Sequence, residues 1–222
     1  MNWFTEILHS DLAQRLRVDE ILYEGRTEFQ DAKVISNGRL GKILVLDNVV
    51  QTTLGDEFVY HEMLAHVPLF SHPSPKAVLI IGGGDGGLLE EALKHPSIEK
   101  VTMVELDGGV VDLAKEHFQE LNQGAFDDKR TNLIIGDGAK FVAETNEKFD
   151  VILVDSTDPQ GPGEVLFSKI FYANCKRCLT ESGILVTQNG VPFLQASELA
   201  GSVAHFRDLF NDGSAYVITV PT

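Results

Sequence analysis

The sequence predicts an α/β protein in which a doubly wound, mostly parallel sheet follows a small antiparallel β-domain. After Asp56, short apolar runs typical of buried strands alternate with stretches whose apolar residues recur at helical spacing. Before Asp56, the chain consists of short β-like runs. Apolar strands that alternate with helices favour a parallel sheet covered on both faces. We therefore predict an antiparallel domain over residues 1–55 and an α/β domain over residues 56–222.

Three β-like runs support the N-terminal prediction, over residues 17–23, 32–35 and 42–46. Asn37 and Gly38 lie between the last two runs. This dipeptide favours a tight hairpin turn because both of its residues tolerate a positive φ. We expect a small antiparallel sheet built around this hairpin.

The α/β prediction begins with a helix whose apolar face includes Phe58, Met63, Leu64 and Val67 and which ends near Pro68. Strands and helices then alternate. The strands are predicted over residues 77–81, 101–105, 133–135, 149–154, 184–187 and 215–220. The helices are predicted over residues 86–95, 110–121, 139–144, 168–179 and 195–210. Ligands of such sheets bind beyond the carboxyl ends of the strands, so the residues after each strand are the candidate site residues.

The charge balance favours a small cationic ligand over nucleic acid. The 222 residues include 33 acids and 18 bases, which gives a net charge of −15. A protein that binds a phosphate backbone needs a basic surface, so we expect no nucleic-acid partner. An acidic cleft would attract a cation, although solubility alone accounts for the charge equally well.

Two cysteines, Cys175 and Cys178, stand in C-x-x-C spacing. A zinc site needs a second pair of ligands, and the surrounding residues are predicted to be helical, so we expect two helical cysteines without a metal. The start of the chain has no basic region followed by an apolar one, and no run is long enough to span a bilayer. We expect a cytoplasmic protein with no membrane partner.

A glycine-rich loop follows the first strand of the predicted α/β sheet and reads Gly82-Gly83-Gly84-Asp85-Gly86-Gly87. Such a loop lets the backbone pass close to a ligand at the start of the next helix, as in Rossmann-like nucleotide-binding domains. The carboxylate of Asp85 would repel a pyrophosphate there and attract a cation. The loop therefore disfavours NAD or FAD and is compatible with S-adenosylmethionine-type ligands.

Acidic residues also follow the second and third strands. Glu105 stands where such a domain places an acceptor for ribose hydroxyls. Asp107 is a candidate cap for the following helix. Asp137 is either an acceptor for an adenine amino group or a cap of the helix that begins near Ala139.

The fourth strand ends in Asp155-Ser156-Thr157-Asp158-Pro159. Together with Asp85, this segment would bring three carboxylates to one edge of the sheet, and no lysine or arginine occurs in these loops. Such a cluster favours a cationic ligand. One carboxylate would accept the proton of an attacking amine and another would hold the far ammonium of a diamine.

These motifs together resemble the polyamine synthase family, and specifically the bacterial spermidine synthases. The resemblance extends over the whole chain and is carried by the following segments: Glu28-Phe29-Gln30-Asp31, Leu46-Asp47-Asn48-Val49-Val50-Gln51-Thr52-Thr53, Asp56-Glu57-Phe58-Val59-Tyr60-His61-Glu62-Met63, Gly82 to Gly87, Asp155 to Pro159 and Gly161-Pro162-Gly163-Glu164. Family members usually continue past the position of Pro221-Thr222, with a tyrosine that lines the amine site. The sequence alone leaves open whether this chain ends at Thr222.

The resemblance implies a fold, an activity and a set of site residues. It implies a Rossmann-like catalytic domain of the S-adenosylmethionine-dependent methyltransferase type behind a β-domain that forms dimers or tetramers. It implies aminopropyl transfer from decarboxylated S-adenosylmethionine to putrescine, giving spermidine and methylthioadenosine, without a prosthetic group or a metal. Asp155 would be the proton acceptor. The amine substrates would contact Asp158, Asp85, His61, Tyr60, Ser156 and Thr157, and the nucleoside part of the donor would contact Gln30, Glu105, Asp137, Gly138, Pro162, Gly82 and Gly84.

Two alternatives remain open at this point. A diamine N-methyltransferase that uses intact S-adenosylmethionine would share the fold, but Asp85 would repel the carboxylate of that donor. A polyamine-binding protein without catalysis would need no base. The sequence does not choose between putrescine, cadaverine, agmatine and spermidine as acceptor, or between dimer and tetramer.

Overall fold

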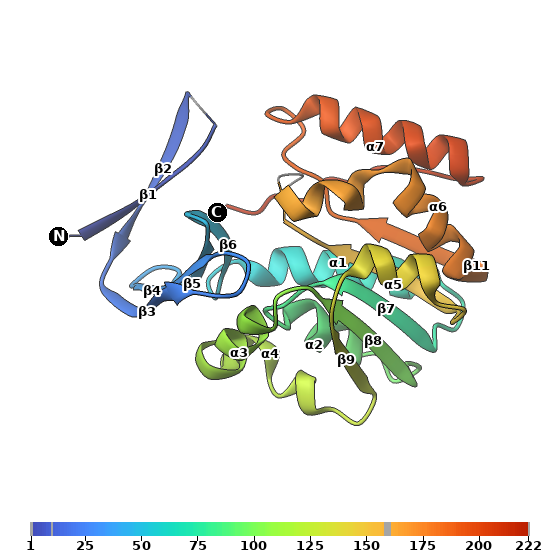
Figure 1. Ribbon diagram of the computed structural model, residues 1–222, viewed down its shortest axis with the longest axis horizontal. Coiled ribbons are helices and arrows are strands. Elements are labelled where there is room, and N and C mark those ends of the chain that lie inside the picture. The colour runs from blue at the N-terminus through green and yellow to red at the C-terminus, as the bar shows by residue number, and fades with distance from the viewer. Residues whose placement is uncertain (1, 10, 158–160, 222) are drawn as a thin grey trace.

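The computed structural model describes residues 2–9, 11–157 and 161–221 and has the predicted fold class. An antiparallel hairpin pairs β1 (Asn2–His9) with β2 (Leu12–Val18) and projects from the rest of the chain (Figure 1). A four-stranded antiparallel sheet follows. Its strands are β3 (Glu20–Arg26), β4 (Asp31–Asn37), β5 (Gly41–Leu46) and β6 (Val49–Thr53), in that order.

The N-terminal domain differs from the prediction in its strand count. The predicted run over residues 17–23 divides at Asp19 into the end of β2 and the start of β3. The carboxylate of Asp19 accepts a hydrogen bond from the Gly38 backbone at 2.7 Å, so this residue turns toward the next hairpin instead of continuing a strand. The strands β1 and β6 were not predicted.

The β4–β5 hairpin forms as predicted, but for a different reason. Neither Asn37 nor Gly38 has a positive φ; the Asn37 side chain accepts the Arg39 N–H at 2.8 Å, and the loop ends at Gly41 with φ 73°. The two-residue turn with positive φ at both positions is Asp47–Asn48, between β5 and β6, with φ values of 47° and 63°.

The second sheet is parallel and has the order β11-β10-β7-β8-β9. Its strands are β7 (Ala77–Gly82), β8 (Lys100–Glu105), β9 (Thr131–Ile135), β10 (Phe149–Asp155) and β11 (Leu179–Thr187). The order reverses between β7 and β10, and such a switch point is where open α/β sheets bind ligands.

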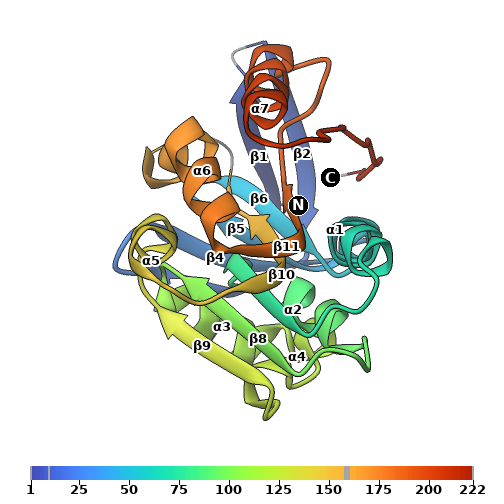
Figure 2. The same ribbon diagram turned by 90° about the vertical axis from the view of Figure 1, so that its right-hand side faces the viewer.

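Helices cover both faces of this sheet (Figures 1 and 2). The side chains of Val78 and Ile80 pack toward one face, with α1 (Glu57–Ser71), α2 (Gly87–Leu93) and α3 (Gly108–His117). Those of Leu79 and Ile81 pack toward the other face. That face is covered by α5 (Gly138–Glu144), α6 (Lys169–Cys178) and α7 (Ala196–Leu209).

The N-terminal sheet is joined to this domain by a shared core. Ala32, Val34, Leu44 and Leu46 pack against Val110 and Leu113 of α3 and against Leu121 of α4 (Gln119–Asn122). A one-turn 3₁₀ segment covers Ala125–Asp127, and a longer 3₁₀ segment covers Gly161–Phe167. This shared core brings the loop after β3 close to the end of β8.

Three other expectations need correction. The predicted strand over 215–220 does not form: in the described part of the chain those residues pair with no strand, and Val217 is 70% exposed. The predicted helix over 110–121 breaks at Phe118, and α1 continues past Pro68 to Ser71. The two cysteines lie on α6 as expected, buried and as free thiols. Among the described residues, no helix combines the length and hydropathy that a membrane span needs.

Candidate active site

The glycine loop holds the ends of β7 and β10 together. Gly82 has φ 84°, and a Cβ there would overlap the carbonyl oxygen of Asp155. The next N–H, that of Gly83, donates to this carbonyl at 3.0 Å. Gly84 lies where a Cβ would be 3.2 Å from the Glu105 carboxyl group. Glycines at these positions therefore let one loop approach two acidic strand ends.

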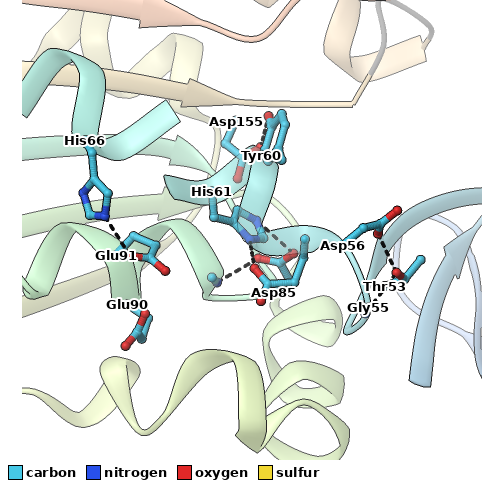
Figure 3. Close-up of polar contacts among 12 residues, drawn as sticks. Thr53, Gly55, Asp56, Tyr60, His61, His66, Asp85, Glu90, Glu91 and Asp155 are labelled. Atoms are coloured by element: carbon cyan, nitrogen blue, oxygen red, sulfur yellow. Dashed lines mark hydrogen bonds and ion pairs between the residues drawn. The ribbon is translucent and has the colours of Figure 1, made fainter. Parts of the chain in front are cut away.

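Asp85 lies at the centre of the site and is held from two sides (Figure 3). Its Oδ1 accepts the Gly87 N–H at 3.0 Å, and its Oδ2 lies 3.4 Å from Nε2 of His61. Burial raises the pKa of Asp85, but the charge of His61 and the hydrogen bonds outweigh burial, so the pKa is lowered overall. Asp85 is therefore an anion close to the end of β10.

Asp155 shares a short hydrogen bond with Tyr60. The Tyr60 hydroxyl donates to Oδ1 of Asp155 at 2.5 Å, and Figure 3 shows the two side chains pointing toward each other. Burial raises the pKa of Asp155 to about 6; the charge of Asp85 acts in the same direction, while His61 and the hydrogen bond from Tyr60 oppose it. A carboxylate with this pKa is a stronger base than an exposed aspartate and is still ionised at neutral pH.

One atom from each of His61, Asp85 and Asp155 lies within 4.8 Å of the others, a spacing that a metal ion would also accept. However, both ring nitrogens of His61 face carboxylates, Nδ1 at 2.6 Å from Glu57 and Nε2 near Asp85. Burial lowers the pKa of His61, but the charge of Asp85 and the contacts with both acids raise it well above 6.5, and a protonated imidazole offers no lone pair to a metal. In this protonation state the cluster suits an organic cation.

Glu105 forms the second acidic position, at the end of β8. Its Oε1 accepts the Asp107 N–H at 2.8 Å. Burial raises the pKa of Glu105 to about 7, and the charges of Asp107 and Asp155 add to this effect. A carboxyl group that is costly to ionise without a partner gains from hydroxyl donors such as those of a ribose.

Asp107 links this position to the N-terminal domain. One of its oxygens caps α3 at Gly109, as the helix-cap prediction expected. The other accepts the Thr27 hydroxyl at 2.6 Å and the Gln30 amide at 2.8 Å. Nothing in the sequence pattern pointed to Thr27, because this contact joins residues 80 positions apart.

Asp137 also caps a helix. It is exposed, and its carboxylate accepts the N–H groups of Ala139 and Lys140 at the start of α5. Gly138 is buried, and a Cβ there would meet Ile81 at 2.5 Å. The helix-cap interpretation of Asp137 is therefore confirmed, while an adenine contact stays a prediction.

The structure brings Tyr60, His61, Asp85 and Asp155 together at one edge of the sheet. Ser156 follows directly, and its carbonyl accepts the Gln188 side-chain amide at 2.8 Å; Thr157 is exposed. Two other predicted residues lie wholly or partly outside the described part of the chain. Asp158 lies outside the described residues, and so does the side chain of Pro162, whose backbone belongs to the 3₁₀ segment Gly161–Phe167.

The fold is an open α/β domain with an acidic site at the switch point of its sheet, and comparisons with known proteins specify the family. The model of the spermine/spermidine synthase domain matches residues 57–222, and that of the spermidine synthase tetramerisation domain matches residues 2–53. The chain therefore belongs to the spermine/spermidine synthase family, a family of enzymes, as the motifs predicted.

Individual relatives agree with this assignment. A polyamine aminopropyltransferase of Ruegeria sp. is 60% identical over 99% of this chain and 78% of its own length. Polyamine aminopropyltransferase 1 of Pseudomonas aeruginosa is 54% identical over 100% of this chain and 78% of its own length. Among solved structures, a spermidine synthase in complex with the transition-state analogue AdoDATO superposes with a TM-score of 0.92 at 39% identity, covering 95% of this chain and 72% of that one. Spermidine synthase from Thermotoga maritima superposes with a TM-score of 0.92 at 36% identity, covering 100% of this chain and 74% of that one.

Proposed function

We propose that this enzyme transfers the aminopropyl group of decarboxylated S-adenosylmethionine to putrescine, giving spermidine and methylthioadenosine. The observation that carries the proposal is the pair of half-buried carboxylates, Asp85 and Asp155, with different pKa shifts at one strand edge. A donor that is a cation at its sulfonium and at its amine, and an acceptor that is a diamine, suit such an anionic site.

The reaction needs a neutral amine nitrogen and an accessible carbon next to the sulfonium. The nitrogen attacks that carbon, the carbon–sulfur bond breaks with its electron pair going to sulfur, and methylthioadenosine leaves as a neutral thioether. The proton lost by the new secondary amine goes to Asp155, whose pKa of about 6 suits a base near neutrality. The sulfonium is already a good leaving group, so we propose neither a metal nor a prosthetic group.

The remaining residues divide between the two substrates. We assign the aminopropyl ammonium of the donor to Asp85, and its ribose to Glu105 and Gln30. Asp137, Gly138, Pro162, Gly82 and Gly84 would surround the rest of the nucleoside. We assign the acceptor to Asp158, Tyr60, His61, Ser156 and Thr157.

We further propose that the chain divides at residues 55 and 56 and works as a homo-oligomer in the cytoplasm. The match of residues 2–53 to a tetramerisation domain supports an assembly of several copies, dimer or tetramer. The proposal includes no nucleic acid and no membrane partner, which agrees with the acidic composition.

Product analysis tests this function. The protein is incubated with putrescine and either decarboxylated or intact S-adenosylmethionine, and the products are identified by mass spectrometry, with each substrate omitted in turn as a control. We expect spermidine and methylthioadenosine from the decarboxylated donor alone. Methylated putrescine from the intact donor would instead identify a methyltransferase. Binding of putrescine without any product would identify a polyamine-binding protein.

A further inference from the structure

Each ring nitrogen of His61 contacts a carboxylate. Its side chain is 3% exposed. Nδ1 lies 2.6 Å from Oε2 of Glu57, one turn earlier on α1, and Nε2 lies 3.4 Å from Oδ2 of Asp85. One carboxylate oxygen of Asp155 also lies within 4.8 Å of a ring nitrogen of His61 and of an oxygen of Asp85.

Packing fixes the ring in this orientation. A Cβ on Gly87, the first residue of α2, would overlap the imidazole, so the glycine leaves just enough room for it. The Tyr60 ring stands edge-on to the imidazole at a centroid distance of 5.3 Å. Close packing against Gly87 and Tyr60 therefore limits how far the imidazole can move from the two carboxylates.

The ring hydrogen-bonds Glu57 at Nδ1 and lies within ion-pair distance of Asp85 at Nε2, and ionised carboxylates only accept hydrogen bonds, so this arrangement favours a proton on each nitrogen. Both nitrogens then carry a proton and the ring is a cation. Such a ring has no lone pair to accept a hydrogen bond from a substrate ammonium. In this state, His61 contributes to the amine site through the acids that it contacts.

We propose that Glu57 is a positioning residue that keeps His61 as an imidazolium, and that His61 acts on the amine site through Asp85. The proposal deepens the function proposed above and rests on it. The resident cation fills the space between Glu57 and Asp85 and keeps Asp85 ionised beside Asp155, so the two acids do not share one proton. Asp85 can then bind the aminopropyl ammonium while Asp155 remains free to act as the base.

The groups that face His61 determine the expected pH dependence. Glu57 comes from α1, Asp85 from the loop after β7, and Asp155 and the Tyr60 hydroxyl from the adjoining side. Burial lowers the pKa of His61, but the charge of Asp85 and the hydrogen bonds to Asp85 and Glu57 outweigh it, so the pKa lies well above 6.5. Removing the charge of Glu57 should therefore let His61 lose its proton at a lower pH.

The test compares Glu57→Gln with the wild type and with Glu62→Gln, an exposed glutamate on the same helix. Two-bond ¹H–¹⁵N spectra of histidine-labelled protein distinguish an imidazolium from either neutral tautomer, and His61→Gln assigns the signal among the seven histidines. We expect an imidazolium at pH 7.5 in the wild type and in Glu62→Gln, and a lower titration midpoint in Glu57→Gln. A neutral His61 in the wild type, or an unchanged midpoint in Glu57→Gln, would overturn the proposal.

Kinetics provide a second measurement. In Glu57→Gln, the acid limb of kcat/KM should move to higher pH, because less positive charge beside Asp85 and Asp155 lets these acids hold a proton more readily, while kcat/KM at pH 8.5 should stay within about twofold of wild type. A kcat/KM lowered equally at pH 6 and pH 8.5 would mean that Glu57 is only structural. The spectra are taken without substrates, so they determine the charge of His61 whether or not the protein transfers an aminopropyl group.

Discussion

Replacing Tyr60 with phenylalanine tests whether Asp155 is the base and what sets its pKa. The hydroxyl of Tyr60 donates to Oδ1 of Asp155 at 2.5 Å, and the hydrogen bond favours the ionised form of the acid. In Tyr60→Phe this preference disappears while burial and the charge of Asp85 still raise the pKa. The pKa of Asp155 should therefore rise from about 6.

The size of the shift follows from the strength of the lost bond. A hydrogen bond to a charged group contributes about 1.5–3 kcal/mol. Each pK unit corresponds to about 1.4 kcal/mol, so the full loss would be roughly one to two units. Water that reaches the vacated position would recover part of this, and we expect a shift of about one unit.

The assay is kcat/KM as a function of pH from 5 to 9 for both proteins. A base with a raised pKa is protonated, and inactive, over a wider range, so the acid limb should move to higher pH in Tyr60→Phe. Tyr172→Phe is the matched control, because it removes a buried hydroxyl that contacts Ser202, outside the site. An acid limb that stays in place, or moves to lower pH, would refute the assignment of the limb to Asp155.

Four further predictions concern the surroundings of the base. Gly82→Ala, at φ 84°, should lower the free energy of unfolding by about 1–3 kcal/mol in denaturant titration, whereas Gly201→Ala, with open space around it, should not. Thr27→Val should raise the KM for the donor roughly tenfold and leave that for the acceptor unchanged, with the exposed Thr5→Val as control; equal effects on both substrates would contradict a link to the donor side. Asp85→Asn should weaken the preference for decarboxylated over intact donor in a competition assay, and unchanged selectivity would count against its role. EDTA should leave turnover unchanged, and a loss that one added metal restores would reveal a metal site.

The parallel sheet was predictable because its strands are buried on both faces. Residues 77–81 form a continuous apolar run, residues 101–105 and 149–154 are mostly apolar, and each run forms a strand close to its predicted bounds. Parallel strands place their carboxyl ends at one edge, so Asp85 and Asp155 could be expected to meet. The fold class and the acidic centre of the site therefore followed from local pattern.

Other features depend on contacts that no local pattern contains. The strand β6 (Val49–Thr53) exists because it pairs with β5, whereas residues 215–220 are irregular despite their apolar character, since no strand within the described ranges pairs with them. Tyr60 entered only through family resemblance, since a tyrosine on a helix carries no sign of a carboxylate partner 95 residues away. Glu57 was not predicted at all, because an acid in the first turn of a helix is ordinary.

The most direct test of the account is the rate of a single turnover in Asp155→Asn, measured with bound donor and saturating putrescine beside Asp112→Asn, an exposed aspartate on α3. The account predicts that the chemical step slows by about 10²–10⁴-fold in Asp155→Asn, while the donor binds with an affinity close to that of the wild type. Asp112→Asn should match the wild type in both respects. A chemical step of unchanged rate in Asp155→Asn would contradict the claim that this carboxylate takes the proton of the attacking amine.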